Sequence, residues 1–154
     1  MLKKRFLIAL LFTLFWAETL CAQPITTKYY SLSLPADWVV LNGPSRGGDN
    51  VRLQLSDKDR TVTATLIVGS VQPGEAKKAA SVYAKQLKVT PRQHAGQTEF
   101  LLTHGQERGY YVMREDASSR LMLLLTVSGN LRKADFLFRM RSPYPNLVPK
   151  PPLF

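Results

Sequence analysis

Residues 120–127 read Arg-Leu-Met-Leu-Leu-Leu-Thr-Val, and the five positions of Leu121-Met122-Leu123-Leu124-Leu125 are all apolar. A strand turns successive side chains to opposite faces, so an unbroken apolar run needs both faces of its sheet covered. We therefore expect residues 120–127 to form a strand at the centre of a sheet. Its cover would be helices on both sides, or a helix on one side and a layer of strands on the other.

Two more strands are predicted directly upstream, at residues 98–103 and 109–114. The polar segments 105–108 and 115–119 lie between the three strands and are rich in Gly, Asp, Glu and Ser. Short polar side chains and glycine stabilise tight turns. This half of the chain is therefore predicted to be an antiparallel meander.

Three strands are also expected in the first half of the chain, at residues 28–34, 51–55 and 62–68, because apolar residues alternate with polar ones there. The second and third of these flank the polar segment 56–60, which indicates a hairpin. Residues 42–50 are predicted to form a loop from their Gly, Pro, Ser and Asn content.

Two amphipathic helices are predicted where the apolar spacing changes. The first follows Pro73-Gly74, runs for about four turns and ends at Thr90-Pro91. The second spans residues 130–141, with Ser128 or Asn130 as its cap, and Ser142-Pro143 ends it. The expected apolar stripes are Ala76, Ala80, Tyr83 and Leu87 for the first helix, and Leu131, Ala134, Leu137, Phe138 and Met140 for the second.

The expected order is three strands, a helix, three strands and a helix (βββ-α-βββ-α). An antiparallel sheet with segregated helices is an α+β fold. We expect one domain over residues 23–142, since the chain shows no internal repeat and no long linker. The tail, residues 143–154, contains five of the ten prolines and is predicted to be extended and irregular.

This layout resembles the PsbP-like fold. The resemblance rests on the stretch Tyr30-Ser31-Leu32-Ser33-Leu34-Pro35-Ala36-Asp37-Trp38, with one helix in mid-chain and a second closing the domain. Members of that family include extrinsic proteins of photosystem II and bacterial envelope proteins such as DcrB. The resemblance implies an α/β/α sandwich that acts as an accessory or binding module, and it supplies no active-site residues.

The first 22 residues are typical of a secretory signal peptide. Lys3, Lys4 and Arg5 precede an apolar stretch from Phe6 to Ala17, and Ala22 offers a small residue for cleavage. The stretch is shorter than the roughly 20 residues of a spanning helix, although an uncleaved anchor stays an alternative. Leu20 stands where a lipid-attachment signal has a small residue, which argues against lipidation of Cys21. We expect a periplasmic or secreted protein.

Cleavage after Ala22 would leave 18 basic and 10 acidic side chains, a net charge of +8, and no cysteine. Such a charge favours anionic partners, including acidic proteins, polysaccharides and membrane headgroups. Nucleic acid is a less favoured partner for an exported chain. Stability would come from an apolar core rather than from disulfides.

No catalytic or metal-binding motif is evident, and no cofactor is expected. His94 and His104 lack the spacing of a zinc site, and no serine stands in a Gly-x-Ser-x-Gly elbow. The acidic residues of segments 56–60 and 115–119 are interpreted as turn-forming. The glycine-rich run 45–49 lacks the frame of a phosphate loop.

Three functions stay open. The first is a non-enzymatic exported accessory protein that binds an envelope protein. The second is an anionic lipid or polymer binder, which requires the basic faces of both helices to form one patch. The third is a small-ligand hydrolase, which requires a histidine near a serine or carboxylate in a pocket beneath loop 42–50. The candidate basic residues are Lys77, Lys78, Lys85, Lys88, Arg132, Lys133 and Arg139.

Overall fold

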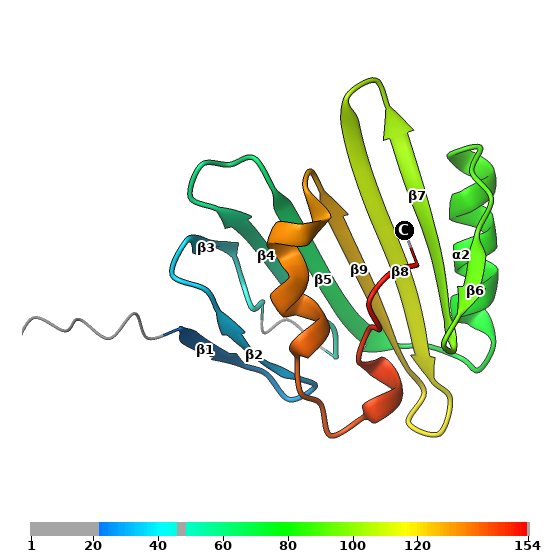
Figure 1. The fold of residues 1–154 in the computed structure, drawn as a ribbon. Helices are drawn as coiled ribbons and strands as arrows, with labels where there is room; N and C mark the ends of the chain where they lie inside the picture. The colour runs from blue at the N-terminus through cyan, green and yellow to red at the C-terminus, as the bar shows by residue number, and fades with distance from the viewer. Residues whose placement is uncertain (1–21, 46–48, 154) are drawn as a thin grey trace, which may run out of the picture.

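The computed structural model describes residues 22–45 and 49–153. Seven strands form one sheet in the order β3-β4-β5-β9-β8-β7-β6, every neighbouring pair is antiparallel, and β1 and β2 form a separate hairpin (Figure 1). The elements are β1 (Gln23–Thr26), β2 (Ser31–Leu34), β3 (Trp38–Asn42), β4 (Val51–Asp57), β5 (Thr63–Ser70), α2 (Glu75–Gln86), β6 (Arg92–His94), β7 (Gln97–His104), β8 (Glu107–Asp116), β9 (Leu121–Ser128) and the 3₁₀ helices η1 (Leu131–Arg139) and η2 (Pro145–Leu147).

Strand β9 lies at the centre of the sheet, between β5 and β8, as its apolar run predicts. The two faces of β9 differ in their cover. Leu121, Leu123 and Leu125 are at most 5% exposed, whereas Met122 and Leu124 are only half-buried. The prediction of two covered faces therefore holds fully for one face and in part for the other.

We call the face of the sheet that carries Leu121, Leu123 and Leu125 the closed face, and it carries the main apolar core. The β1–β2 hairpin, η1 and the C-terminal tail all pack on it, and Trp38 contacts Phe136 edge-on at 4.9 Å between ring centroids. The first predicted strand is shorter than expected, because Thr27 caps a turn that ends at Tyr30. Its alternation is nevertheless present, since Tyr30, Leu32 and Leu34 are all buried.

The second predicted helix is a 3₁₀ helix. Leu131, Ala134, Leu137 and Met140 recur at every third position, which is the period of a 3₁₀ helix rather than of an α-helix. Ala134, Leu137 and Met140 are buried against the closed face. Asn130 caps the helix, and its side chain accepts a hydrogen bond from the Arg132 N–H at 3.1 Å.

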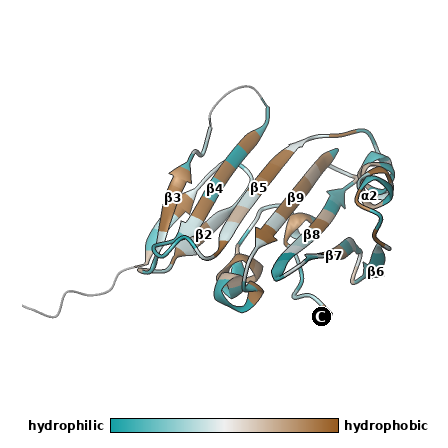
Figure 2. Cartoon of the chain, turned by 90° about the horizontal axis from the view of Figure 1, so that it is seen from above, coloured by the Kyte–Doolittle hydropathy of each residue, from teal (hydrophilic) through white to brown (hydrophobic). Residues whose placement is uncertain are grey.

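Helix α2 lies on the other face, against β7 and β8 (Figure 2). Its buried residues are Ala76, Ala80 and Ala84, whose small side chains let the helix approach the sheet closely. The prediction for Tyr83 was wrong, because its side chain is 45% exposed. The helix ends at Gln86, one turn before the predicted end at Thr90-Pro91.

Helix α2 begins without a side-chain cap of its own. Gly74 stands at the N-cap with a φ of 83°. Its N–H donates to the Glu115 carboxylate of β8 at 2.8 Å, and the Ala76 N–H donates to the same carboxylate at 3.3 Å. A carboxylate at a helix N-terminus satisfies free N–H groups and opposes the positive end of the helix dipole. The sheet thus caps the helix.

The mixed α and β composition and the antiparallel sheet agree with the sequence prediction, but the element order differs. Five strands precede α2 and four follow it in the described residues, because β1, β3 and β6 are additional. These three strands are only three to five residues long, too short for an alternating pattern to identify.

Candidate functional site

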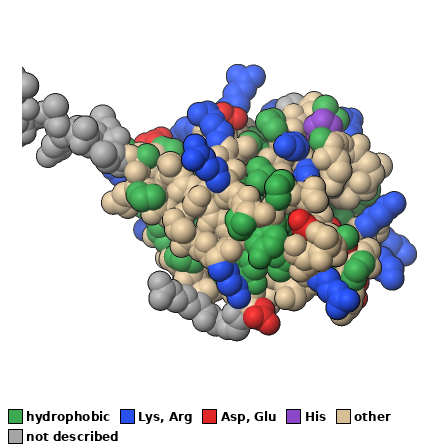
Figure 3. All heavy atoms as spheres, turned by 90° about the horizontal axis from the view of Figure 1, so that it is seen from below, with side chains coloured by type: hydrophobic (Ala, Val, Ile, Leu, Met, Phe, Trp, Pro, Cys, Tyr) green, Lys and Arg blue, Asp and Glu red, His purple; other side chains and the backbone are tan. Residues whose placement is uncertain are grey.

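The predicted basic residues form two separate groups. Helices α2 and η1 lie on opposite faces of the sheet (Figure 2), so the single patch required for an anionic-surface binder is not formed by these seven residues. At the lower end of the molecule, Lys and Arg side chains also lie in several separate groups (Figure 3). The α2 group is Lys77, Lys78, Lys85 and Lys88, all exposed, and the η1 group is Arg132, Lys133 and Arg139.

Two of the three η1 residues bind carboxylates of the same chain. Lys133 donates to Asp57 and to the Thr61 hydroxyl, both at 3.0 Å, and Arg139 pairs with Asp135 at 2.5 Å. Lys133 therefore joins η1 to the β4–β5 hairpin. Only Arg132 of this group keeps its guanidinium unpaired among the described residues.

Asp57 and Asp116 stabilise the predicted turns in which they lie, whereas Glu115, which was also interpreted as turn-forming, caps α2 instead. Asp57 accepts hydrogen bonds from the Thr61 and Val62 N–H groups at 2.7 and 2.8 Å, and Asp116 accepts from the Ser118 hydroxyl at 2.5 Å. The Thr61 hydroxyl, with these backbone donors and Lys133, lowers the pKa of Asp57 below its usual range. Ser118 in the same way lowers the pKa of Asp116.

The two histidines do not assemble a hydrolytic site. His94 lies in β6 and His104 at the end of β7, and within residues 22–45 and 49–153 neither makes a hydrogen bond to a serine or a carboxylate. No group of three or more His, Cys, Asp or Glu residues there could hold a metal ion. The pocket expected beneath loop 42–50 lies in part outside the described residues, since positions 46–48 are among those not described.

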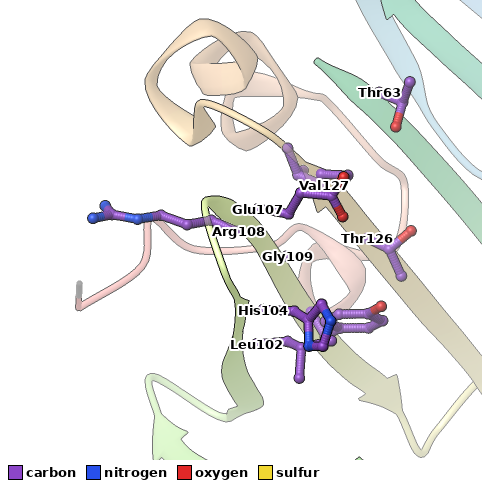
Figure 4. A pocket seen from close by; sticks show the side chains of 10 residues that line it. Thr63, Leu102, His104, Glu107, Arg108, Gly109, Thr126 and Val127 are labelled. Atoms are coloured by element: carbon purple, nitrogen blue, oxygen red, sulfur yellow. The ribbon is translucent and has the colours of Figure 1, made fainter. Parts of the chain in front are cut away.

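A small hollow of about 200 Å³ does lie beside His104, at the β7–β8 hairpin end of the sheet (Figure 4). His104, Glu107 and Thr126 line it, and Arg108 points away from His104. Among the described residues, no hydrogen bond orients the imidazole, so the hollow offers no positioned base.

A buried polar cluster lies on the closed face and holds the C-terminal tail. The Glu99 side chain is fully buried and accepts hydrogen bonds from Tyr110 at 2.7 Å and Gln97 at 2.9 Å. The Lys150 N–H of the tail donates to Gln97 at 2.9 Å. Burial and the neighbouring Glu99 carboxylate raise the pKa of Tyr110. The proline-rich tail is therefore packed against its own domain.

The two edges of the sheet differ sharply in chemistry. Strand β3 forms one edge of the sheet and carries Val39, Val40 and Leu41, which are 36%, 41% and 50% exposed, respectively. Strand β6 forms the opposite edge, and its sequence Arg92-Gln93-His94 is polar and charged. The sequence pattern missed β3, although a run of three apolar residues after Trp38 in a solvent-facing segment is itself a signal.

Within residues 22–45 and 49–153, edge strand β3 pairs only with β4, so half of its N–H and C=O groups point away from the strands of the sheet. A bulge between Val40 and Asn42 interrupts the pairing at one end. Natural sheets protect such an edge with charged residues, with proline, with a bulge or by keeping the edge strand short. Strand β3 carries no charged residue and no proline, so its protection is limited to its length of five residues and its bulge.

No helix of the described residues is long and apolar enough to cross a membrane. Comparison with known proteins found no matching family model and no matching curated protein.

Proposed function

We propose that this chain is an exported, non-enzymatic accessory protein that binds another protein of the cell envelope, and that β3 is its docking element. The observation that carries the proposal is the exposed run Val39-Val40-Leu41 on a sheet edge that no other described strand covers. An extended segment of a partner can add to such an edge as a further strand. The backbone would supply hydrogen bonds, and the three side chains would supply apolar contacts.

The contrast between the two edges of the sheet supports the proposal that β3 is a binding surface. Strand β6 carries Arg92, a charged residue of the kind that prevents edge-to-edge association, and strand β3 carries no charge over Trp38–Asn42. An apolar edge in a protein of this charge is a liability unless a partner covers it. The partner is expected to present an extended apolar segment, with acidic residues beside it to complement the basic chain.

The family resemblance agrees with this function. We propose that α2, the sheet and η1 form the α/β/α sandwich of the PsbP-like fold, with η1 in place of its second α-helix. Support comes from the positions of α2 and η1 on opposite faces of the sheet (Figure 2). The apolar stretch from Phe6 to Ala17 supports export.

Site-specific photo-crosslinking tests the docking edge. The full chain is produced in cells with the photoreactive residue p-benzoylphenylalanine at position 41 of β3, or at position 93 of β6 as the matched control on the opposite edge. We expect one specific heterologous protein to crosslink from position 41 and not from position 93. The substitution Val40→Lys, which places a charge on the edge, is expected to abolish the crosslink.

The variant must fold for the result to count. Val40 is 41% exposed, so Val40→Lys should change the free energy of unfolding by less than about 1 kcal/mol. Equal crosslinking from both positions, or a crosslink that survives Val40→Lys, would refute the docking edge. A crosslinked product made only of two copies of this chain would replace the proposed partner with a homodimer.

A further inference from the structure

A second surface, independent of the β3 edge, lies at the end of the sheet where β9 passes into η1. A groove of about 890 Å³ opens there between the β4–β5 turn, the β7–β8 hairpin and η1, at the upper end of the sheet in Figure 1. Arg60, Arg108 and Arg132 line it, one from each of these segments. We call this hollow the arginine groove.

The groove also has an apolar part. Leu101 of β7 and Leu131 and Phe138 of η1 line it, and all three side chains are half-buried. Phe138 is held by an edge-on contact with Tyr110, at 6.2 Å between ring centroids. Ligand sites typically combine such an apolar surface with a few converging polar groups, in volumes of about 300–1,000 Å³.

Gly129 fixes the three segments against one another. Its φ is +99°, and a Cβ on it would lie 2.4 Å from the Thr61 carbonyl oxygen, so the backbones of Gly129 and Thr61 are in close contact. The Gly129 N–H donates to the Arg108 carbonyl at 2.8 Å. The next residue, Asn130, caps η1. The backbones that carry the three arginines are therefore set by one rigid junction.

The charges of the groove are not balanced internally. Two carboxylates also line it, Glu107 and Asp135, but Asp135 is bound by Arg139 at 2.5 Å. Among the described residues, the guanidinium groups of Arg60, Arg108 and Arg132 form no ion pair and no hydrogen bond. The residues that line the groove thus include three guanidinium groups without a partner among the described residues and one carboxylate outside an ion pair, so we expect the groove to attract anions.

We propose that the arginine groove binds a small amphipathic anion, with its carboxylate or phosphate on the arginines and its apolar portion on Leu101, Leu131 and Phe138. Guanidinium groups suit this ligand because their planar donors match carboxylate and phosphate oxygens in pairs. A wholly polar anion would leave the apolar part of the groove uncovered. A neutral amphiphile would leave the arginines unused.

Isothermal titration calorimetry with three probes tests the two halves of the site. The full chain is titrated with dodecyl phosphate below its micelle concentration, with inorganic phosphate and with the neutral dodecyl maltoside. We expect dodecyl phosphate to bind most tightly, by about tenfold or more over each of the others. Equal binding of dodecyl phosphate and inorganic phosphate would overturn the apolar half of the proposal. Equal binding of the two dodecyl compounds would overturn the anionic half.

Paired variants locate the site. Arg60→Gln/Arg108→Gln is expected to weaken dodecyl phosphate binding by about tenfold or more, because charge-assisted hydrogen bonds are lost. The control Lys78→Gln/Arg120→Gln removes two exposed charges outside the groove and should leave binding unchanged. An equal loss in both double variants would show general electrostatic attraction and overturn the site.

A variant in the apolar part of the groove tests whether that part contributes to binding or whether the arginines alone bind the anion. Leu131→Gln should weaken dodecyl phosphate and leave inorganic phosphate unaffected, and amide NMR spectra report whether the variant keeps its fold. A folded Leu131→Gln variant with undiminished dodecyl phosphate binding would contradict the proposed pose. Since Val40→Lys alters only the β3 edge, it should retain dodecyl phosphate binding whether or not the docking proposal holds.

Discussion

Replacing Gly129 with alanine tests the junction that joins β9 to η1. The new Cβ would lie 2.4 Å from the Thr61 carbonyl oxygen, whereas ordinary contact begins at 3.4 Å, so the two backbones must separate by about 1 Å. The hydrogen bond from the Gly129 N–H to Arg108, at 2.8 Å, opposes that movement. A non-glycine residue at a φ of +99° costs about 1–3 kcal/mol, and forced overpacking costs about 1–3 kcal/mol more. We expect a total loss of about 2–6 kcal/mol.

A matched variant separates the close contact from the backbone conformation. Gly105 in the β7–β8 turn also has a positive φ, +60°, but a Cβ added to it would meet no described atom within 4 Å. Gly105→Ala should therefore cost only about 1–2 kcal/mol. Urea unfolding followed by the fluorescence of Trp38, which is 4% exposed, measures both variants. Equal losses, or a loss below about 1 kcal/mol for Gly129→Ala, would refute the rigid junction.

Three further predictions concern stability. Tyr30→Phe should leave the free energy of unfolding unchanged or raise it by about 1 kcal/mol, since among the described residues the buried Tyr30 hydroxyl has no hydrogen-bond partner; a clear loss in urea unfolding would contradict this. Glu115→Ala should cost about 1 kcal/mol and speed amide exchange in the first turn of α2, because two N–H groups lose their acceptor; unchanged exchange would show that the cap has no role. The pKa values of Asp57 and Asp116 are lowered on folding, so their stabilising effect is present above pH about 4 and is lost as the pH falls. Asp57→Asn and Asp116→Asn should therefore each make the free energy of unfolding fall less steeply on acidification. An unchanged dependence of the free energy of unfolding on pH would contradict the assigned hydrogen bonds.

The sequence predicted those elements whose burial produces a regular pattern. The unbroken apolar run of residues 121–125 identified the central strand, and the alternation over 62–68 identified its neighbour. Both patterns arise because a sheet face must exclude water. The turn roles of Asp57 and Asp116 were also predictable, since they depend on residues only a few positions away.

Other elements were missed because tertiary contacts decide them. The spacing of three between Leu131, Ala134 and Leu137 fits an α-helix loosely and a 3₁₀ helix closely, and packing on the sheet selected the second. Tyr83 has the spacing of a core residue, but the stripe that α2 buries is Ala76, Ala80 and Ala84, and the Tyr83 side chain is 45% exposed.

The two candidate surfaces lay beyond the reach of sequence patterns for a related reason. An edge strand is defined by the absence of a neighbour on one side, and no pattern in its own residues records that absence. Arg60 lies in the β4–β5 turn and Arg108 near the start of β8, and they line one groove with Arg132 at a junction where Gly129 adopts a backbone conformation that other residues resist. A glycine between a strand and a helix was the one local sign of that junction.

The position of β9 also governs the order in which the molecule can form. Strand β5 ends at Ser70, yet the strand that completes its other side begins only at Leu121. Pairing across such a long stretch of chain is slow to form, because the intervening segment must first be ordered. Until β9 arrives, β3-β4-β5 and β6-β7-β8 are two small sheets whose inner edges both lie open. A nascent or truncated chain that stops before Leu121 is thus expected to aggregate through these edges, and insertion of a single strand converts both halves into one cooperative unit.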